Sequence, residues 1–225
     1  MEEHASPGRF ITFEGGEGSG KSTQINRLAE HLRSLPSMAQ VEVVTTREPG
    51  GTPMAEDIRE LLVTGKPNSM QSKTELLLVL AARVEHVETL INPVLQKGGW
   101  VLCDRFVDST LAYQGYGRGM SLEHLNMLNN WALSGLKPDL TLFLDIDPLS
   151  GLERTKPRGA NSEQSGEAED RFEQTGVKFH KLVYDGFCQL ARQNPGRIKS
   201  VDARQNMEDV QKAIWGVVSS AFPNL

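Results

Sequence analysis

A glycine-rich segment near the N-terminus has the composition of a phosphate-binding loop. Residues 15–23 read Gly-Gly-Glu-Gly-Ser-Gly-Lys-Ser-Thr and match the pattern G-x-x-x-x-G-K-[ST] without a mismatch. In such a loop the main-chain amides and the N-terminus of the next helix hold phosphates, because glycines let several N–H groups point into one concavity. We therefore expect a nucleotide to bind at Gly15, Gly16, Glu17, Gly18, Ser19, Gly20, Lys21, Ser22 and Thr23.

The same motif predicts chemistry for two of its side chains. Lys21 is expected to reach the β- and γ-phosphates of a nucleoside triphosphate, and the Ser22 hydroxyl is expected to ligate Mg²⁺. The strand-like run 9–14 precedes the loop, and apolar residues recur at helical spacing over 25–32. A glycine-rich turn that merely matches the pattern is the simpler alternative, and the flanking strand and helix argue against it.

Composition and charge narrow the class of protein. The chain has 225 residues and a formal net charge of −5, which argues against broad nucleic-acid binding because that needs a basic face. No apolar run approaches the ~20 residues of a membrane helix, and the N-terminal segment lacks the features of a signal peptide. Two cysteines cannot build a disulfide framework. We therefore predict a cytoplasmic protein with neither nucleic-acid nor membrane partners.

The rest of the sequence alternates strand-like and helical segments. β-Branched and apolar runs predict strands at 9–14, 41–47, 99–104, 138–145 and 197–202, with helices between them. This alternation without an internal repeat predicts an α/β fold of the P-loop NTPase type, with a five-stranded parallel sheet and helices on both faces. We expect a single domain of this P-loop type over residues 9–225, preceded by a disordered tail at 1–8.

Three segments between the strands carry more specific expectations. Residues 72–98 predict a long helix, which Pro93 could break and whose wide apolar surface favours a homodimer over a purely monomeric core. The glycines of residues 105–119 predict a loop. Residues 154–171 are polar and poor in large apolar side chains, so we expect them to form a flexible lid.

Polar clusters follow the predicted strands. They are Arg47-Glu48-Pro49-Gly50-Gly51-Thr52 after the second strand, Asp104-Arg105-Phe106 after the third, and the arginines of the lid region. Loops at the carboxyl ends of parallel strands meet at one sheet edge, so a second anionic substrate would meet arginines from several directions. Phosphoryl transfer between two nucleotides needs this arrangement, and a lid would exclude water. A surface ion pair and solvated lid arginines are the simpler alternatives.

Six motifs in order and spacing resemble those of the bacterial thymidylate kinase family. The resemblance covers residues from about 9 to about 222, and it implies Mg²⁺-dependent transfer of the ATP γ-phosphoryl group to thymidine monophosphate within a homodimer. The motifs lie at residues 14–23, 46–52, 81–83, 104–106, 112–115 and 138–142.

The resemblance also implies roles for individual residues of the acceptor site. Glu17 should approach the 3′-hydroxyl of the acceptor, Arg105 should hold its 5′-phosphate, and Asp104 should organise Mg²⁺ and its waters. Arg83 is similar to the arginine that touches the thymine ring. Other acceptor contacts implied in this way are Arg47 and Pro49 in the pocket wall, Thr110 and Gln114 on the base edge, and Tyr113 at the sugar 2′ position.

The resemblance places the catalytic arginine in the lid, because the phosphate loop lacks one. Arg158 is the first candidate, with Arg154 and Arg171 in support, and Arg204 is similar to a residue beside adenine. Two departures from the family pattern stand out in the sequence. Residues 79–80 are Val-Leu where the family usually has an aromatic residue that stacks on thymine, and the lid carries several acidic residues, Glu163, Glu167 and Glu169.

Several alternatives remain open from the residues alone. A deoxynucleoside kinase also combines a phosphate loop with an Asp-Arg pair, whereas a GTP-binding switch would need an Asn-Lys-x-Asp motif that the sequence lacks. Asp145 and Asp147 could form a second metal site, although capping of the helix that follows Pro148 is favoured. The histidines show no metal-ligand spacing, so we expect only solvation or helix packing from them.

Overall fold

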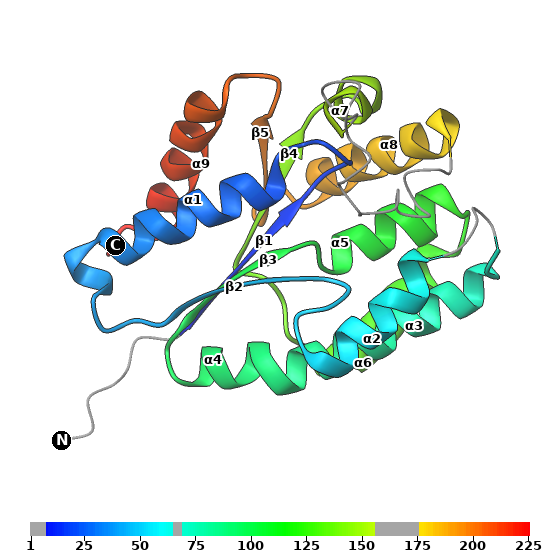
Figure 1. Cartoon of the computed structure of the whole chain (residues 1–225), viewed down its shortest axis with the longest axis horizontal. Helices are drawn as coiled ribbons and strands as arrows, with labels where there is room; N and C mark the ends of the chain where they lie inside the picture. The colour runs from blue at the N-terminus through cyan, green and yellow to red at the C-terminus, as the bar shows by residue number, and fades with distance from the viewer. Residues whose placement is uncertain (1–7, 65–68, 156–175) are drawn as a thin grey trace, which may run out of the picture.

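Five parallel strands form the centre of the molecule (Figure 1). The computed structural model describes residues 8–64, 69–155 and 176–225. The sheet has the order β2-β3-β1-β4-β5, and every neighbouring pair is parallel, as predicted. The strands are β1 (Arg9–Glu14), β2 (Val43–Arg47), β3 (Trp100–Asp104), β4 (Leu140–Asp145) and β5 (Ile198–Asp202).

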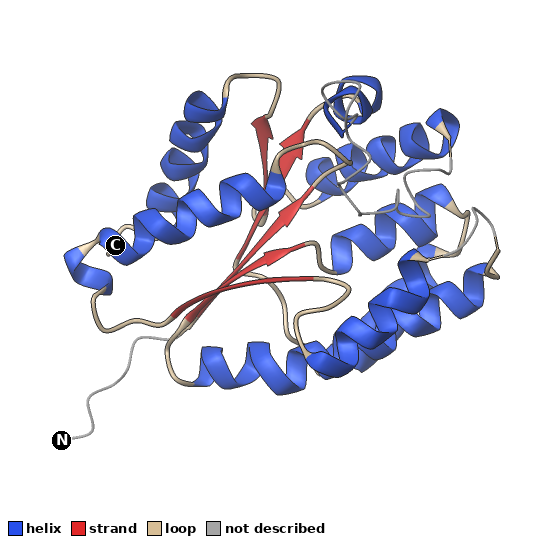
Figure 2. Cartoon of the chain, in the orientation of Figure 1, coloured by secondary structure: helices blue, strands red, loops and turns tan. Residues whose placement is uncertain are grey.

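Helices cover both faces of this sheet (Figure 2). The helical segments that precede β3 are α1 (Lys21–Ser34), η1 (Pro36–Met38), α2 (Pro53–Val63), α3 (Ser72–His86), η2 (Val87–Ile91) and α4 (Asn92–Gln96). Those that follow β3 are α5 (Val107–Thr110), η3 (Leu111–Gly117), α6 (Leu122–Leu133), α7 (Pro148–Thr155), α8 (Val177–Gln193) and α9 (Met207–Ala221).

The alternation of side chains along β1 divides the core between the two faces. Ile11 and Phe13 pack in one apolar cluster with Leu28 of α1 and Ile214 of α9. Phe10 points to the opposite face, where it joins the cluster built around η2 and α4. Because successive side chains of a strand alternate between faces, this short run anchors both helical layers.

A second cluster on the opposite face holds the helices that carry the acceptor residues. Phe143 of β4 packs there with Leu76 of α3, Leu125 of α6 and Phe187 of α8. Tyr113 of η3 lies in the same cluster, 6.0 Å from the Phe179 ring by centroids. The helix that carries the predicted base-edge residues is thus fixed by aromatic packing.

The strand register brings the polar clusters to one edge of the sheet. Arg47 at the end of β2 is opposite Asp104 of β3, and Asp104 is opposite Phe13 of β1. The strand order changes direction beside β1, and crevices at such switch points are where open α/β sheets bind ligands.

The prediction of a loop at 105–119 is wrong, because α5 and η3 make most of this segment helical. Its glycines serve close packing instead of a turn. A Cβ on Gly115 would lie 2.5 Å from Leu122 Cδ2, and one on Gly117 would lie 2.6 Å from the Phe179 ring. Of the three glycines in the segment, only Gly119 has positive φ (74°).

The long helical run expected at 72–98 is present, with a different interruption. It consists of α3, the π-helical η2 and α4, which ends at Gln96. Pro93 lies in the first turn of α4, where its missing N–H costs little, and the wider π turn precedes it. Pro93 therefore marks a change of helix type and not a break.

Several predicted segments lie outside the described residues. They are residues 1–7 of the predicted tail, the end of the second predicted helix near 65–67, and the predicted lid from residue 156 onward. Within the described ranges, no helix has the length and apolar character that crossing a membrane requires.

The contrast between two helical glycines gives a test of this packing. A Cβ on Gly186 in α8 would lie 2.7 Å from the Tyr116 ring, whereas one on Gly216 in α9 meets no atom within 4 Å. We predict that Gly186→Ala lowers the free energy of unfolding by about 1–3 kcal/mol through overpacking. Gly216→Ala should raise it by about 0.5–1 kcal/mol through helix propensity. Urea denaturation of both variants checks this, and a stabilised Gly186→Ala would contradict the packing described.

Candidate active site

The phosphate loop folds around the Lys21 ammonium group. Lys21 is the first residue of α1, and its Nζ donates to the main-chain oxygens of Gly15 (3.3 Å) and Gly16 (3.0 Å). Gly20 caps the helix in the left-handed conformation, with φ 88°. The loop backbone thus wraps the lysine at the N-terminus of α1, where the helix dipole adds positive potential.

The loop also packs closely against α7. Gly18 has φ 67°, and a Cβ at this position would collide with the main-chain carbonyl of Gly151. A Cβ on Gly151 would in turn collide with the carbonyl of Glu17. Two glycines are therefore needed where the helix after β4 meets the loop. Asp147 Oδ1 accepts a bond from the Ser150 amide at 3.0 Å, which confirms helix capping for this residue.

Oxygen atoms suited to a divalent cation lie beside the loop. Ser22 Oγ donates to Asp104 Oδ2 at 3.1 Å. Asp104 Oδ1 is buried and has no hydrogen-bond partner among the described residues. Hydroxyl and carboxylate oxygens are the ligands that Mg²⁺ prefers, and Mg²⁺ commonly takes only one or two protein ligands beside substrate phosphates. Ser22 and Asp104 therefore fit the predicted magnesium ion.

Arg105 joins the phosphate loop to the segment after β3. Its Nη2 pairs with Glu17 Oε1 at 2.6 Å, and its Nη1 donates to the Gly15 carbonyl at 3.0 Å. Tyr113 Oη donates to the same Glu17 oxygen at 2.9 Å, and the Arg105 guanidinium carbon lies 5.1 Å from the Tyr113 ring centroid. The backbone of Arg105 is left-handed, with φ 67°, a conformation that costs about 1–3 kcal/mol and often occurs at functional sites.

The charges in this cluster alter one another's titration. Burial opposes ionisation of Glu17, but Arg105, Lys21 and the Tyr113 hydrogen bond outweigh it and lower the pKa of Glu17 to about 2. Burial, together with the positive charge of Arg105, lowers the pKa of Lys21. Glu17 is therefore ionised at neutral pH and can accept hydrogen bonds but not donate them.

A pocket of about 460 Å³ connects the phosphate loop with η3. It is large enough for a nucleotide-sized ligand and combines charged residues with a few apolar ones. Its lining residues are Glu17, Gly18, Gly20, Lys21, Ser22, Thr23, Arg47, Glu48, Pro49, Arg59, Leu62, Val63, Val79, Arg83, Asp104, Arg105, Phe106, Ser109, Thr110, Tyr113 and Gln114.

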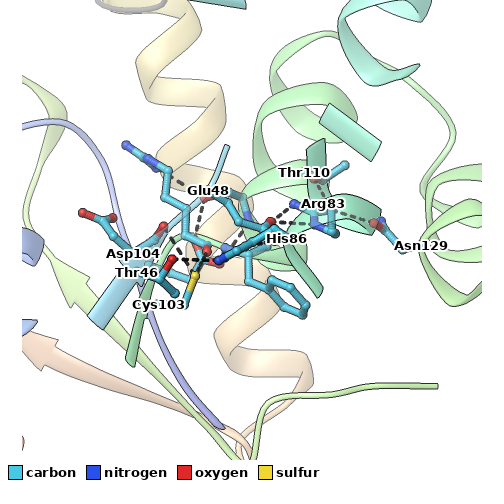
Figure 3. Close-up of polar contacts among 12 residues, drawn as sticks. Thr46, Glu48, Arg83, His86, Cys103, Asp104, Thr110 and Asn129 are labelled. Atoms are coloured by element: carbon cyan, nitrogen blue, oxygen red, sulfur yellow. Dashed lines mark hydrogen bonds and ion pairs between the residues drawn. The ribbon is translucent and has the colours of Figure 1, made fainter. Parts of the chain in front are cut away.

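Arg83 forms the wall of the pocket through a buried hydrogen-bond network (Figure 3). Its side chain is only 2% exposed and pairs through Nε with Glu48 Oε2 at 2.7 Å. Nη1 donates to Thr110 Oγ1 (2.8 Å) and Asn129 Oδ1 (2.7 Å), and Nη2 donates to the Phe106 carbonyl (3.1 Å). One guanidinium thus ties the loop after β2 to α5 and α6.

His86 extends the same network beneath the loop after β2 (Figure 3). It is fully buried, its Nδ1 lies 3.2 Å from Glu48 Oε1, and its Nε2 lies 2.7 Å from Thr46 Oγ1. A Cβ on Gly51 would collide with both Thr46 and His86, so the loop lies directly on them. The expectation that histidines serve only solvation or helix packing is therefore wrong for His86.

Comparison with known proteins places the chain in a family. A family model described as thymidylate kinase matches residues 13–214. A thymidylate kinase of Magnetococcus marinus is 50% identical over 96% of this chain and 97% of its own length. The chain belongs to the thymidylate kinase family. A thymidylate kinase of Lactobacillus delbrueckii is 44% identical over 97% of this chain and 99% of its own.

A solved structure agrees with the fold. The crystal structure of thymidylate kinase from Ehrlichia chaffeensis superposes with a TM-score of 0.74 at 35% identity, covering 95% of this chain and 99% of that one. The P-loop NTPase fold predicted from the sequence is thereby confirmed.

Most residues expected from the thymidylate kinase resemblance meet in the pocket. The exceptions within the phosphate loop, which do not line the pocket, are Gly15, Gly16 and Ser19. The predicted residues that do are Glu17, Gly18, Gly20, Lys21, Ser22, Thr23, Arg47, Pro49, Arg83, Asp104, Arg105, Thr110, Tyr113 and Gln114.

The remaining predicted arginines lie elsewhere. Arg154 donates to the carbonyls of Ala203 (2.9 Å) and Arg204 (3.4 Å), and Arg204 pairs with Asp202 at 2.8 Å. These residues form a cluster beside β5 that does not line the pocket. Residues 158 and 171, expected to bear the catalytic lid arginines, lie outside the described residues.

Some functional side chains were missed by sequence reasoning. Arg59 of α2 lines the pocket and donates to the Pro49 carbonyl at 3.1 Å, yet in the sequence it is one charge on an amphipathic helix. Ser109 also lines the pocket, but the segment around it was interpreted as a loop. Glu14 ends β1 and is the first residue of the motif at 14–23, but sequence reasoning assigned its side chain no role, although a carboxyl group in an apolar run is a signal of a buried role.

Glu14 supports Arg105 from inside the protein. Its Oε1 accepts from the Phe106 amide (2.8 Å) and the Ser109 amide (3.3 Å), and its Oε2 accepts from Ser109 Oγ at 2.5 Å. Burial and the negative charge of Asp108 raise the pKa of Glu14 to about 8, against the lowering effect of the Ser109 bond. Asp108 itself pairs with Arg197 at 2.6 Å.

The raised pKa of Glu14 predicts a pH-dependent stability. Between the ordinary pKa of 4.5 and about 8, the folded protein binds the Glu14 proton more tightly than the unfolded chain does. This contribution to the free energy of unfolding is present below pH 4.5 and is lost as the pH rises through 8. We predict that Glu14→Gln reduces the decline in stability between pH 5 and pH 8 by about 1–3 kcal/mol.

Urea denaturation at several pH values measures this difference. Glu30→Gln, which changes an exposed carboxyl of α1 to an amide, is the control and should follow the wild-type pH profile. Parallel profiles for the wild type and Glu14→Gln would contradict a raised pKa at Glu14.

Proposed function

We propose that this chain transfers the γ-phosphoryl group of ATP to thymidine monophosphate and releases thymidine diphosphate. The observation that carries the proposal is the 2.6 Å pair between Arg105 and Glu17, because it joins the phosphate loop to the predicted acceptor residues within one pocket. Membership of the thymidylate kinase family supports the choice of acceptor. A deoxynucleoside kinase, the alternative left open by the sequence, is not favoured by these relationships.

The donor half of the proposed site is the phosphate loop. Main-chain amides at 15–20 and the Lys21 ammonium would hold the β- and γ-phosphates of ATP. Ser22 and Asp104 would hold Mg²⁺, which when bound supplies positive charge that offsets the negative charge of the phosphates. The buried Asp104 Oδ1 without a partner among the described residues supports this assignment.

The acceptor half is built from Arg105, Glu17 and Tyr113. The Arg105 guanidinium, in the proposed role, binds the 5′-phosphate of the acceptor and directs one of its oxygens toward the donor phosphate. Ionised Glu17 accepts a hydrogen bond from a sugar hydroxyl, and the Tyr113 ring limits the space beside the sugar. Positive charges fixed before the reaction stabilise the transferring phosphoryl group without later reorganisation.

The lid arginines remain part of the proposal. Arg158 is proposed as the catalytic arginine with Arg171 in support. The bonds from Arg154 to the carbonyls of Ala203 and Arg204 support a positioning role, in which Arg154 holds the loop proposed to lie beside adenine. The two free cysteines, of which Cys103 is buried, fit the proposed cytoplasmic location.

A homodimer is proposed from an exposed apolar surface on three helices. α2 packs on α3 and α3 packs on α6, and Figure 1 shows the three helices together. Their exposed apolar residues include Trp131, which is 78% exposed, with Leu61, Leu77 and Met127. Apolar surface of this kind on neighbouring helices is typical of an interface between subunits.

Substrate preference tests the proposed reaction. ATP should be consumed fastest with thymidine monophosphate when the monophosphates of deoxyuridine, deoxycytidine and deoxyguanosine and unphosphorylated thymidine are compared. Arg105→Ala should lower kcat/KM for thymidine monophosphate by about 10³-fold, because a charged contact to the reacting phosphate is lost. Arg27→Ala is the control, because Arg27 of α1 donates to Gln211 Oε1 of α9 at 2.7 Å and does not line the pocket. Faster turnover of thymidine than of thymidine monophosphate would contradict the proposed reaction.

Charge placed on the apolar surface tests the dimer. Trp131→Glu should convert a dimer to a monomer in sedimentation velocity, because burying the new carboxylate at a subunit interface is costly. Met207→Glu places a charge on an exposed apolar residue of α9, outside the three-helix surface, and should leave the dimer intact. A monomeric wild type, or a Trp131→Glu variant that remains dimeric, would refute this interface.

A further inference from the structure

A buried ion pair lies behind the proposed acceptor site. Glu75, in the first turn of α3, is fully buried, and its Oε2 pairs with Arg118 Nη2 at 3.2 Å. The Arg118 guanidinium carbon lies 4.7 Å from the Phe179 ring centroid on α8. A buried carboxylate is costly unless it is paired and hydrogen-bonded, so the pairing calls for a structural reason.

Glu75 also binds the side chain of Gln114. The Gln114 Nε2 donates to Glu75 Oε1 at 3.0 Å, and Arg118 Nε lies 3.4 Å from the same oxygen. Both partners belong to one rigid segment, because the Arg118 amide donates to the Tyr113 carbonyl (2.9 Å) and the Met120 amide to the Gln114 carbonyl (3.0 Å). Glu75 therefore holds the end of η3 through two side chains.

This contact determines which way the Gln114 amide faces. An ionised carboxylate accepts hydrogen bonds and cannot donate them, so only the NH₂ end of the amide can face Glu75. Glu75 accepts from Arg118 and Gln114 alike, so its carboxylate acts as the hydrogen-bond acceptor of the pair. Gln114 lines the pocket, and the amide atom that does not bind Glu75 is its carbonyl oxygen, Oε1.

We propose that the Glu75–Arg118 ion pair is a specificity determinant that fixes Gln114 with its Oε1 toward the acceptor, so that the site selects a base with a ring N–H donor. The proposal rests on the proposed function, since it concerns the base of the same acceptor nucleotide. Glu75 and Arg118 are positioning residues, because they act through Gln114.

The N3 atoms of thymine and cytosine differ in the way this selection requires. Thymine carries a hydrogen on N3, which can donate to Oε1, whereas cytosine has a lone pair on N3. Two acceptors facing each other leave both without a hydrogen bond, and such a mismatch in a closed site is costly. Methylation of thymine N3 removes the donor while the rest of the base is kept.

The experiment compares Glu75→Gln with the wild type on three acceptors. Glutamine at position 75 can accept or donate, so the Gln114 amide becomes free to turn over. We expect the wild type to prefer thymidine monophosphate over its N3-methyl derivative and over deoxycytidine monophosphate in kcat/KM. Glu75→Gln should lower both ratios by roughly 10-fold. Glu85→Gln on the same helix, where Glu85 contacts Thr89 at the surface, is the matched control and should keep both ratios.

The ratios separate positioning from general damage. Loss of structure would lower kcat/KM for every acceptor alike and leave the ratios unchanged. Arg118→Lys, which keeps the charge opposite Glu75, should retain the wild-type ratios, whereas Arg118→Met should lower them. If Glu75→Gln does not fold, the two Arg118 variants test whether the ion pair positions Gln114.

Two failures are distinguishable. If the wild type does not phosphorylate thymidine monophosphate at all, the proposed function fails. If it does, but accepts the N3-methyl derivative equally well, or if folded Glu75→Gln and Arg118→Met keep the wild-type ratios, then the assignment of Glu75 and Arg118 is overturned.

Discussion

The pair between Arg105 and Glu17 is the interaction on which the proposed site depends. The parallel register of β1 and β3 brings their carboxyl ends to the same edge, and the pair then links the two loops that leave them. Opposite charges in a partly buried pocket stabilise each other's ionised state, as the low pKa of Glu17 shows. The left-handed backbone of Arg105 persists because contacts to the Gly15 carbonyl and to Glu17 fix the side chain at its far end.

A layer of buried polar groups supports this pair from behind. Glu14 holds the amide of Phe106, the residue next to Arg105, and Arg83 holds the carbonyl of the same residue. One residue is thus bound at both its N–H and its C=O by groups from β1 and α3. Buried polar groups cost free energy unless they are hydrogen-bonded, and removing any member of the network leaves its partner without a hydrogen bond. The network therefore favours one arrangement of the loop that carries Arg105 over the alternatives.

The features that sequence reasoning recovered depend on local patterns. Each strand was predicted within two residues of its observed bounds, because a buried parallel strand is a short apolar run. The phosphate loop was recognised from the spacing of its residues and from the strand and helix that flank it. The helical η3 was missed because glycines signal turns locally, whereas Gly115 serves contact with Leu122. The partners of Arg83, Glu48 and Asn129, lie 35 and 46 residues away, a pairing that no periodicity encodes.

The carbonyl that binds the two cations of the pocket gives a physical reason why the proposed site would favour phosphate. Lys21 Nζ and Arg105 Nη1 both donate to the carbonyl of Gly15, at 3.3 and 3.0 Å. A neutral carbonyl binds a cation less strongly than a phosphate oxygen does, because the negative phosphate adds the attraction between opposite charges. Exchange of carbonyl contacts for phosphate contacts is therefore favourable, and it needs only side-chain movement. Two cations held on one carbonyl also start close together, where the donor and acceptor phosphates must meet.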